Sequence, residues 1–156
     1  MRDGATALGY ALTVALAAIV FYAGFTTLLD LRADPLAYGA VALCGTISGA
    51  VAWPRTHEEF GRSHVALQIG SRTAIWFYLL FTTATVTERF PEYFGEIDGG
   101  TQTLMTMLFS LPALIVASLG AMIYATFGAA FFISAFIAGG WVRLARRAAP
   151  PRPPPA

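Results

Sequence analysis

Residues 99–142 read GGTQTLMTMLFSLPALIVASLGAMIYATFGAAFFISAFIAGGWV, a run of 44 residues between Asp98 and Arg143 without a single charge. As one straight helix, this run would be about 66 Å long at 1.5 Å per residue. The hydrocarbon core of a bilayer is only about 30 Å thick, and roughly 20 apolar residues cross it. The run is too long for a single crossing, so we expect it to fold back on itself.

The segment from Tyr124 to Gly128 is the expected turn in this run, because residues that tolerate a membrane interface meet a glycine there. The turn divides the run into two predicted helices, about 101–124 and 127–147. Pro112 is expected to kink the first of them, because proline cannot donate to the helical hydrogen-bond ladder.

Three earlier apolar runs predict helices at about 6–29, 35–53 and 65–87. The whole chain is 56% hydrophobic and only 12% charged, whereas soluble domains are about a quarter charged. These features predict an all-α integral membrane protein, a compact bundle of five transmembrane helices in the cell membrane, with residues 1–147 as a single domain. The proline-rich residues 148–156 are predicted to form a disordered tail.

The distribution of arginine predicts which side of the membrane each end occupies, since basic residues favour cytoplasmic segments. Three arginines directly follow the last predicted helix, so the C-terminus is predicted to be cytoplasmic. Five spans would place six arginines inside and four outside, the inside set being Arg32, Arg89, Arg143, Arg146, Arg147 and Arg152. The alternative is four spans plus a re-entrant hairpin, which places eight inside and two outside; it requires the final run to cross only once.

Small residues recur at intervals of four in several predicted helices, a pattern that lets helix backbones approach closely in lipid. The clearest case is the G-x-x-x-G pattern of the second helix. The predicted helix-packing residues are Gly45, Gly49, Ala117, Ala121, Ala135 and Gly139. Two outcomes remain open: packing within one bundle, or association of the chain with itself.

Arg72 lies about two turns into the third predicted helix and is the only charge between Val65 and Thr87. A guanidinium at the centre of a membrane helix is unfavourable by about 2.5–3.5 kcal/mol, so a charge in a span is a candidate functional group. Arg72 is therefore a candidate contact for an anion or anionic substrate. The alternative is that its long side chain reaches the headgroups on the His64 side.

Tryptophan and arginine at helix ends are predicted to anchor the chain at the membrane interface. The predicted anchors are Trp53, Trp141, Arg143, Arg146 and Arg147. The predicted partners are the lipid bilayer and either further copies of the chain or a larger membrane complex. The net charge of +1 gives no attraction to nucleic acid.

Several chemistries lack their residues in this sequence. All ten basic residues are arginine, so no lysine is present to form a Schiff base. Cys44 is the only cysteine, so an internal disulfide is excluded. His57 and His64 are seven residues apart, unlike the spacing of four in helical metalloprotease motifs. We expect no cofactor, no metal and no catalytic residue, although enzymatic activity is left open.

Two functions agree with this sequence. The first is a small accessory, assembly or structural membrane subunit that acts through helix packing. The second is a small transporter or channel in which Arg72 lies near the permeation path.

Overall fold

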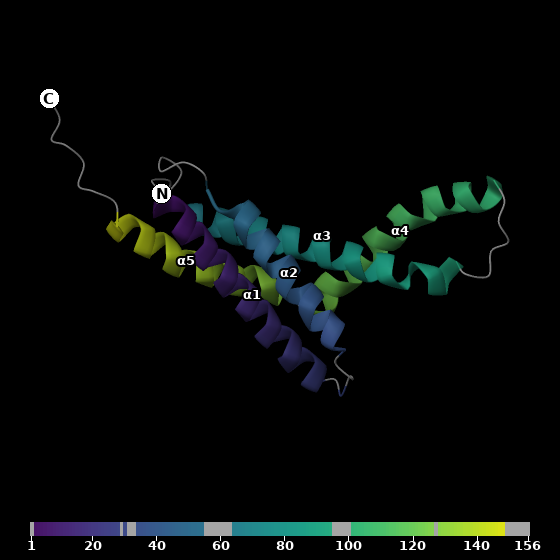
Figure 1. Cartoon of the computed structure of the whole chain (residues 1–156), viewed down its shortest axis with the longest axis horizontal. Coiled ribbons are helices and arrows are strands. Elements are labelled where there is room, and N and C mark those ends of the chain that lie inside the picture. Colours follow the sequence, from purple (N-terminus) through teal and green to yellow (C-terminus); the bar gives the residue numbers. More distant parts are fainter. Residues whose placement is uncertain are drawn as a thin grey trace, which may run out of the picture.

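The computed structural model describes residues 2–28, 30, 34–54, 64–94, 101–126 and 128–148. These residues form five α-helices (Figure 1): α1 Arg2–Leu28, α2 Pro35–Ala52, α3 Val65–Phe94, α4 Thr101–Ala125 and α5 Ala129–Ala148. The predicted helices therefore exist, but α3 continues seven residues beyond its expected end at Thr87. Charged side chains such as Glu88 end an apolar run without ending a helix, because glutamate and arginine are good helix formers. The predicted tail lies outside the described residues, apart from Ala148 at the end of α5.

The start of α2 follows directly from its sequence. Pro35 occupies the first turn, where its missing N–H breaks no helical hydrogen bond. Asp34 caps the helix, since its carboxylate accepts a hydrogen bond of 3.0 Å from the Leu36 N–H. The chain can therefore reverse within a few residues of the end of α1.

α1 and α2 form an antiparallel pair that is held together by small residues. A Cβ atom placed on Gly49 would lie 2.8 Å from the Cα of Ala11, and one placed on Gly45 would lie 2.8 Å from the Cα of Ala15. Both distances are too short for a real side chain, so the two backbones meet where only hydrogen fits. Small residues allow this approach, and close approach gives the van der Waals contact on which helix association in lipid depends.

α3 pairs with α5 near its start and with α4 further along. Three hydrogen bonds mark the register: Ser134 to the Gly70 carbonyl (2.8 Å), Tyr78 with Thr126 (2.6 Å), and Thr82 to the sulfur of Met122 (3.7 Å). The residue number of the partner falls as that of α3 rises. Both α5 and α4 therefore run antiparallel to α3, one after the other along its length.

The 44-residue run does break where predicted, but the prediction that it folds back is wrong. α4 ends at Ala125 and α5 begins at Ala129. Gly128 lies between them with φ at 66°, a left-handed conformation that favours glycine, and its N–H bonds the Ile123 carbonyl at 3.1 Å. α4 packs against α3 rather than against α5. The reason is the length of α3: its 30 residues extend for about 45 Å and offer both helices a partner.

Buried and exposed positions have an unusual distribution of polarity. The buried residues include the hydroxyl-bearing Ser48, Thr73, Thr82 and Ser134. Large apolar side chains are exposed on all five helices; examples are Leu12, Leu43, Ile75, Val116 and Phe136. Among the described residues, three helical segments have the length and composition of membrane spans: Gly4–Leu28, Pro35–Ala52 and Ala129–Arg147. The apolar part of α4, Ser110–Ile123, is shorter.

The tight contact between α1 and α2 can be tested by replacing two glycines of α2 by alanine, one at a time. Gly49→Ala should lower the free energy of unfolding by about 1–3 kcal/mol, because the new methyl group overlaps the Ala11 backbone. Gly39→Ala is the control, since nothing lies within 4 Å of a Cβ at that position. Circular dichroism during denaturation in mixed micelles measures both. An equal effect of the two substitutions would contradict this packing.

Candidate functional site

The two helix pairs meet at one end of the molecule and separate toward the other. Figure 1 shows the start of α1 and the end of α5 at the shared end, while the end of α1 and the helix α4 lie apart. At the shared end Tyr10 is buried, its ring 4.8 Å from that of Trp53 and its hydroxyl 2.8 Å from the Thr73 hydroxyl. Trp141 of α5 donates to the Thr13 hydroxyl of α1 at 3.3 Å. These contacts join α1, α2, α3 and α5 into one bundle.

A cleft of about 340 Å³ opens where the pairs separate. α1 supplies one wall and α3 the other, with residues of α4 and α5 at the back. Six aromatic side chains line it: Phe21, Tyr22, Phe25, Phe77, Tyr78 and Phe81. Smaller residues, among them Ala18, Ala121 and Ala130, give it depth.

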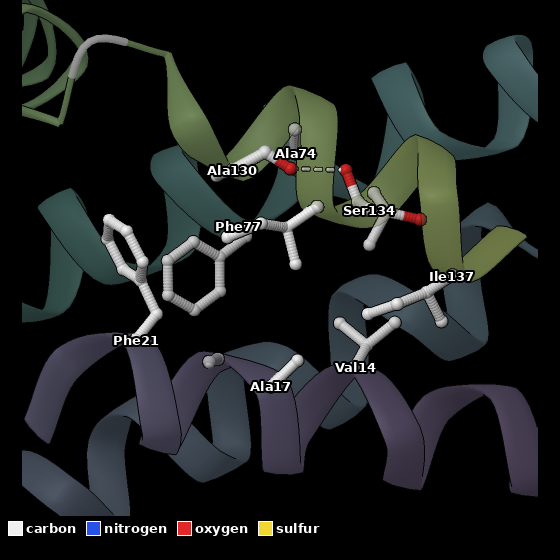
Figure 2. A pocket seen from close by; sticks show the side chains of 11 residues that line it. Val14, Ala17, Phe21, Ala74, Phe77, Ala130, Ser134 and Ile137 are labelled. Carbon is white, nitrogen blue, oxygen red and sulfur yellow. Dashed lines mark hydrogen bonds between the residues drawn. The ribbon is translucent and has the colours of Figure 1, made fainter. Parts of the chain in front are cut away.

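A smaller cavity of about 50 Å³ continues from the cleft toward the shared end. Figure 2 shows Val14, Ala17 and Phe21 of α1 on one side, facing Phe77 of α3 and Ile137 of α5 on the other. Phe21 and Phe77 line both spaces. The cavity and the cleft therefore adjoin each other between α1 and the helices opposite, and we call the two together the groove.

The hydroxyl groups beside this groove are occupied by hydrogen bonds to the protein itself. Thr126 donates to the Met122 carbonyl at 2.9 Å, which leaves its oxygen to accept from Tyr78. Thr73 likewise donates to the Ile69 carbonyl at 2.8 Å and accepts from Tyr10. Among the described residues, no buried side-chain nitrogen or oxygen lacks a partner. The groove therefore presents hydrocarbon and aromatic surface.

The chemistry available in the groove is that of apolar contact. Among the described residues that line it, the titratable groups are the phenols of Tyr22 and Tyr78. Within the described ranges, no group of three or more His, Cys, Asp or Glu residues is placed to hold a metal ion. Cys44 is buried as a free thiol in α2, and it lines neither space. The groove suits a hydrocarbon chain or an apolar helix, which aromatic side chains contact over a large area.

The predicted helix-packing residues divide into two groups. Gly45 and Gly49 meet α1, and the backbone of Ala135 meets α3 at Gly70. The other three do not lie at close helix contacts. Ala117 is exposed, Ala121 lines the cleft, and Gly139 has open space where a Cβ would be.

Two contact residues were missed by sequence reasoning. Gly70 lies so close to the Ala135 backbone that no Cβ fits, and Gly9 lies against the ring of Trp141. A signal for Gly70 was present, because Ala66, Gly70 and Ala74 form a row of small residues at spacing four. Gly9 offered no such signal, since its partner is a single distant tryptophan.

Arg72 and the predicted anchors occupy different surroundings. Arg72 is exposed on α3 and lines neither the cavity nor the cleft. Arg143, Arg146 and Arg147 are exposed near the end of α5. Trp53, in contrast, is only 5% exposed because its ring packs on Tyr10 inside the bundle. Trp141 is half-buried against α1.

The bond between Tyr78 and Thr126 ties the break between α4 and α5 to α3, and a double-mutant cycle can measure it. Tyr78→Phe and Thr126→Val should each destabilise the fold. Their coupling energy should be about 0.6 kcal/mol and at most about 1.7 kcal/mol, the range for hydrogen bonds between membrane helices. Denaturation of the four proteins in mixed micelles provides the values. Strictly additive effects would show that the bond contributes nothing.

Comparisons of the chain with protein-family models, with curated proteins and with solved structures give no match.

Proposed function

We propose that the chain is a small multi-pass membrane protein that acts as an accessory or assembly subunit through helix packing. The observation that carries this proposal is the combination of an apolar exterior with an apolar groove that opens between two helix pairs.

The exterior supports a membrane setting. Phe136 is 86% exposed, and Leu8, Leu12, Leu16 and Val20 form an exposed row along α1. Water-soluble monomers rarely present continuous apolar surface of this kind. Lipid gives helices no hydrophobic reason to associate, and their contacts then consist of small residues and hydroxyls. The contacts at Gly45, Gly70 and Ser134 are of this type.

The register of α3 supports four crossings. Because α5 and α4 both run antiparallel to α3, they form one return passage that is broken at Gly128. If α1, α2 and α3 each cross once, α5 makes the fourth crossing, since its segment Ala129–Arg147 is long enough to span by itself. α4 then follows the further part of α3 and adds no crossing, so both chain ends lie on the same side. The arginine count then becomes eight on the cytoplasmic side and two outside, Arg32 and Arg89. The predicted five spans gave a weaker division of six and four.

The groove supports an accessory role. Its small residues leave room for another apolar segment, and its aromatic residues supply contact area on both walls. We propose that a membrane-spanning helix of a larger complex occupies it. The position of Arg72 lends no support to the transporter alternative, because this residue lines neither space in the bundle.

The four-crossing topology predicts where reporter domains will be found. Fusions placed after Thr56 and at the C-terminus should both report the cytoplasm, and a fusion after Gly95 should report the outside. Paired alkaline phosphatase and green fluorescent protein fusions measure these positions. The control is a fusion after Asp30, which should also report the outside. Opposite sides for Thr56 and the C-terminus would establish an odd number of crossings and refute the topology.

If a partner helix occupies the groove, the same substitution should have different effects on the assembly at two alanines of α4. Ala121→Phe should fill the cleft and release the chain from its complex, because Ala121 lines the cleft wall. Ala117→Phe, one turn earlier and exposed outside the cleft, should leave the complex intact. Native gel electrophoresis of membranes in mild detergent measures the size of the assembly. An assembly that persists with Ala121→Phe would refute a role for the cleft.

A further inference from the structure

Gln68, Arg72 and Trp76 lie at intervals of four along α3 and are all exposed. The opposite side of the same turns is buried, with Ile69 and Thr73 packed inside the bundle. Residues four apart lie on one face of a helix. The outer face of α3 therefore carries a short row of side chains, which we call the Gln68–Arg72–Trp76 row.

This row consists of hydrogen-bond donors that have no partner among the described residues. A guanidinium offers five N–H groups, an indole one and a carboxamide two. None of these three side chains has a hydrogen bond or ion pair within the part of the chain that the structure describes. The first carboxylate along α3 is Glu88, about 24 Å beyond Arg72 at 1.5 Å per residue. No carboxylate of α3 is therefore close enough to form an ion pair with Arg72.

The depth of the row fits the boundary between headgroups and hydrocarbon. Arg72 lies seven residues after Val65, the first residue of α3, and hence about 10 Å along the helix. An arginine at this depth can extend its stem toward the headgroups and keep its guanidinium polar. Trp76 lies one turn deeper and is 44% exposed, so its indole faces the level of the acyl chains beneath the headgroups.

The surroundings of the row favour a lipid over a second copy of the chain. Leu67 and Ile75 are exposed beside it and offer apolar surface to acyl chains. A symmetric dimer through this face, with both copies in the same orientation, would bring two Arg72 side chains together and oppose association. Arginine binds phosphate through two parallel hydrogen bonds, so a phosphate headgroup satisfies the donors that a second copy would repel.

We propose that the Gln68–Arg72–Trp76 row binds the phosphate headgroup of an anionic phospholipid in the leaflet on the side of the two chain ends. Arg72 holds the phosphate, Gln68 donates from the shallower turn, and Leu67 and Ile75 contact the acyl chains. The inference rests on the membrane setting proposed above, and it gives Arg72 a binding role on the outside of the bundle.

Quenching of Trp76 fluorescence tests this site in the full-length protein reconstituted in phosphatidylcholine vesicles. Phosphatidylglycerol with brominated acyl chains should quench more strongly than brominated phosphatidylcholine at the same mole fraction. Trp76→Phe should remove this difference, since Trp53 is buried and Trp141 is half-buried. Arg72→Leu should weaken the relative affinity for phosphatidylglycerol about fivefold, which corresponds to about 1 kcal/mol for one basic residue at an anionic surface.

Two further variants separate a site from general attraction between charges. Arg143→Leu removes the same charge from an exposed position on α5 and should keep the preference for phosphatidylglycerol. Gln68→Leu changes no charge and should weaken the preference. Equal quenching by the two lipids in the unaltered protein, or equal effects of Arg72→Leu and Arg143→Leu, would overturn the proposal. Loss of the preference on addition of inorganic phosphate would also overturn it, by showing a site for a soluble anion.

Failure of this inference is distinguishable from failure of the proposed membrane setting. Extraction of the protein from vesicles by alkaline carbonate would refute the membrane setting itself. A protein that resists extraction but shows no lipid preference would refute only the site at Arg72.

Discussion

The contact between Gly70 of α3 and Ala135 of α5 places two helix backbones so close that no side chain fits between them. Ser134 reinforces it by donating to the Gly70 carbonyl across the interface. Gly45 and Gly49 of α2 meet α1 in the same way. In both helix pairs, the closest contact is therefore between glycine on one helix and alanine on the other. Tyr10, Trp53 and Thr73 join the two pairs at the shared end.

The length of α3 determines how α4 and α5 pack. A shorter helix would leave α4 without a partner, whereas 30 residues accommodate α5 and then α4 in one register. Gly128 supplies the left-handed residue that lets the two helices change direction between these contacts. The same extension carries α3 and α4 away from the end of α1 (Figure 1), and the aromatic cleft lies between these helices.

Two tyrosine–threonine pairs in the bundle use their hydroxyl groups in the same way. Tyr10 donates to Thr73 and Tyr78 to Thr126, while each threonine donates to a carbonyl four residues earlier in the chain. A tyrosine from one helix thereby reaches the next without leaving a polar group unpaired. This arrangement keeps the groove apolar although four hydroxyls lie beside or near it. Arg72 and Gln68 lie apart from these bonds, exposed on the outer face of α3.

The sequence by itself determined that the chain is helical, where most helices begin and end, and that the long run breaks near Gly128. These properties depend on local features: apolar run length, Asp34 and Pro35 at a helix start, and glycine at a turn. The tertiary structure alone decided that α4 follows α3 instead of returning along α5, that Trp53 faces inward and that a cleft opens at Phe21 and Phe77. An apolar run has the same composition whether it folds back or continues, so its direction depends on which helix offers a matching surface.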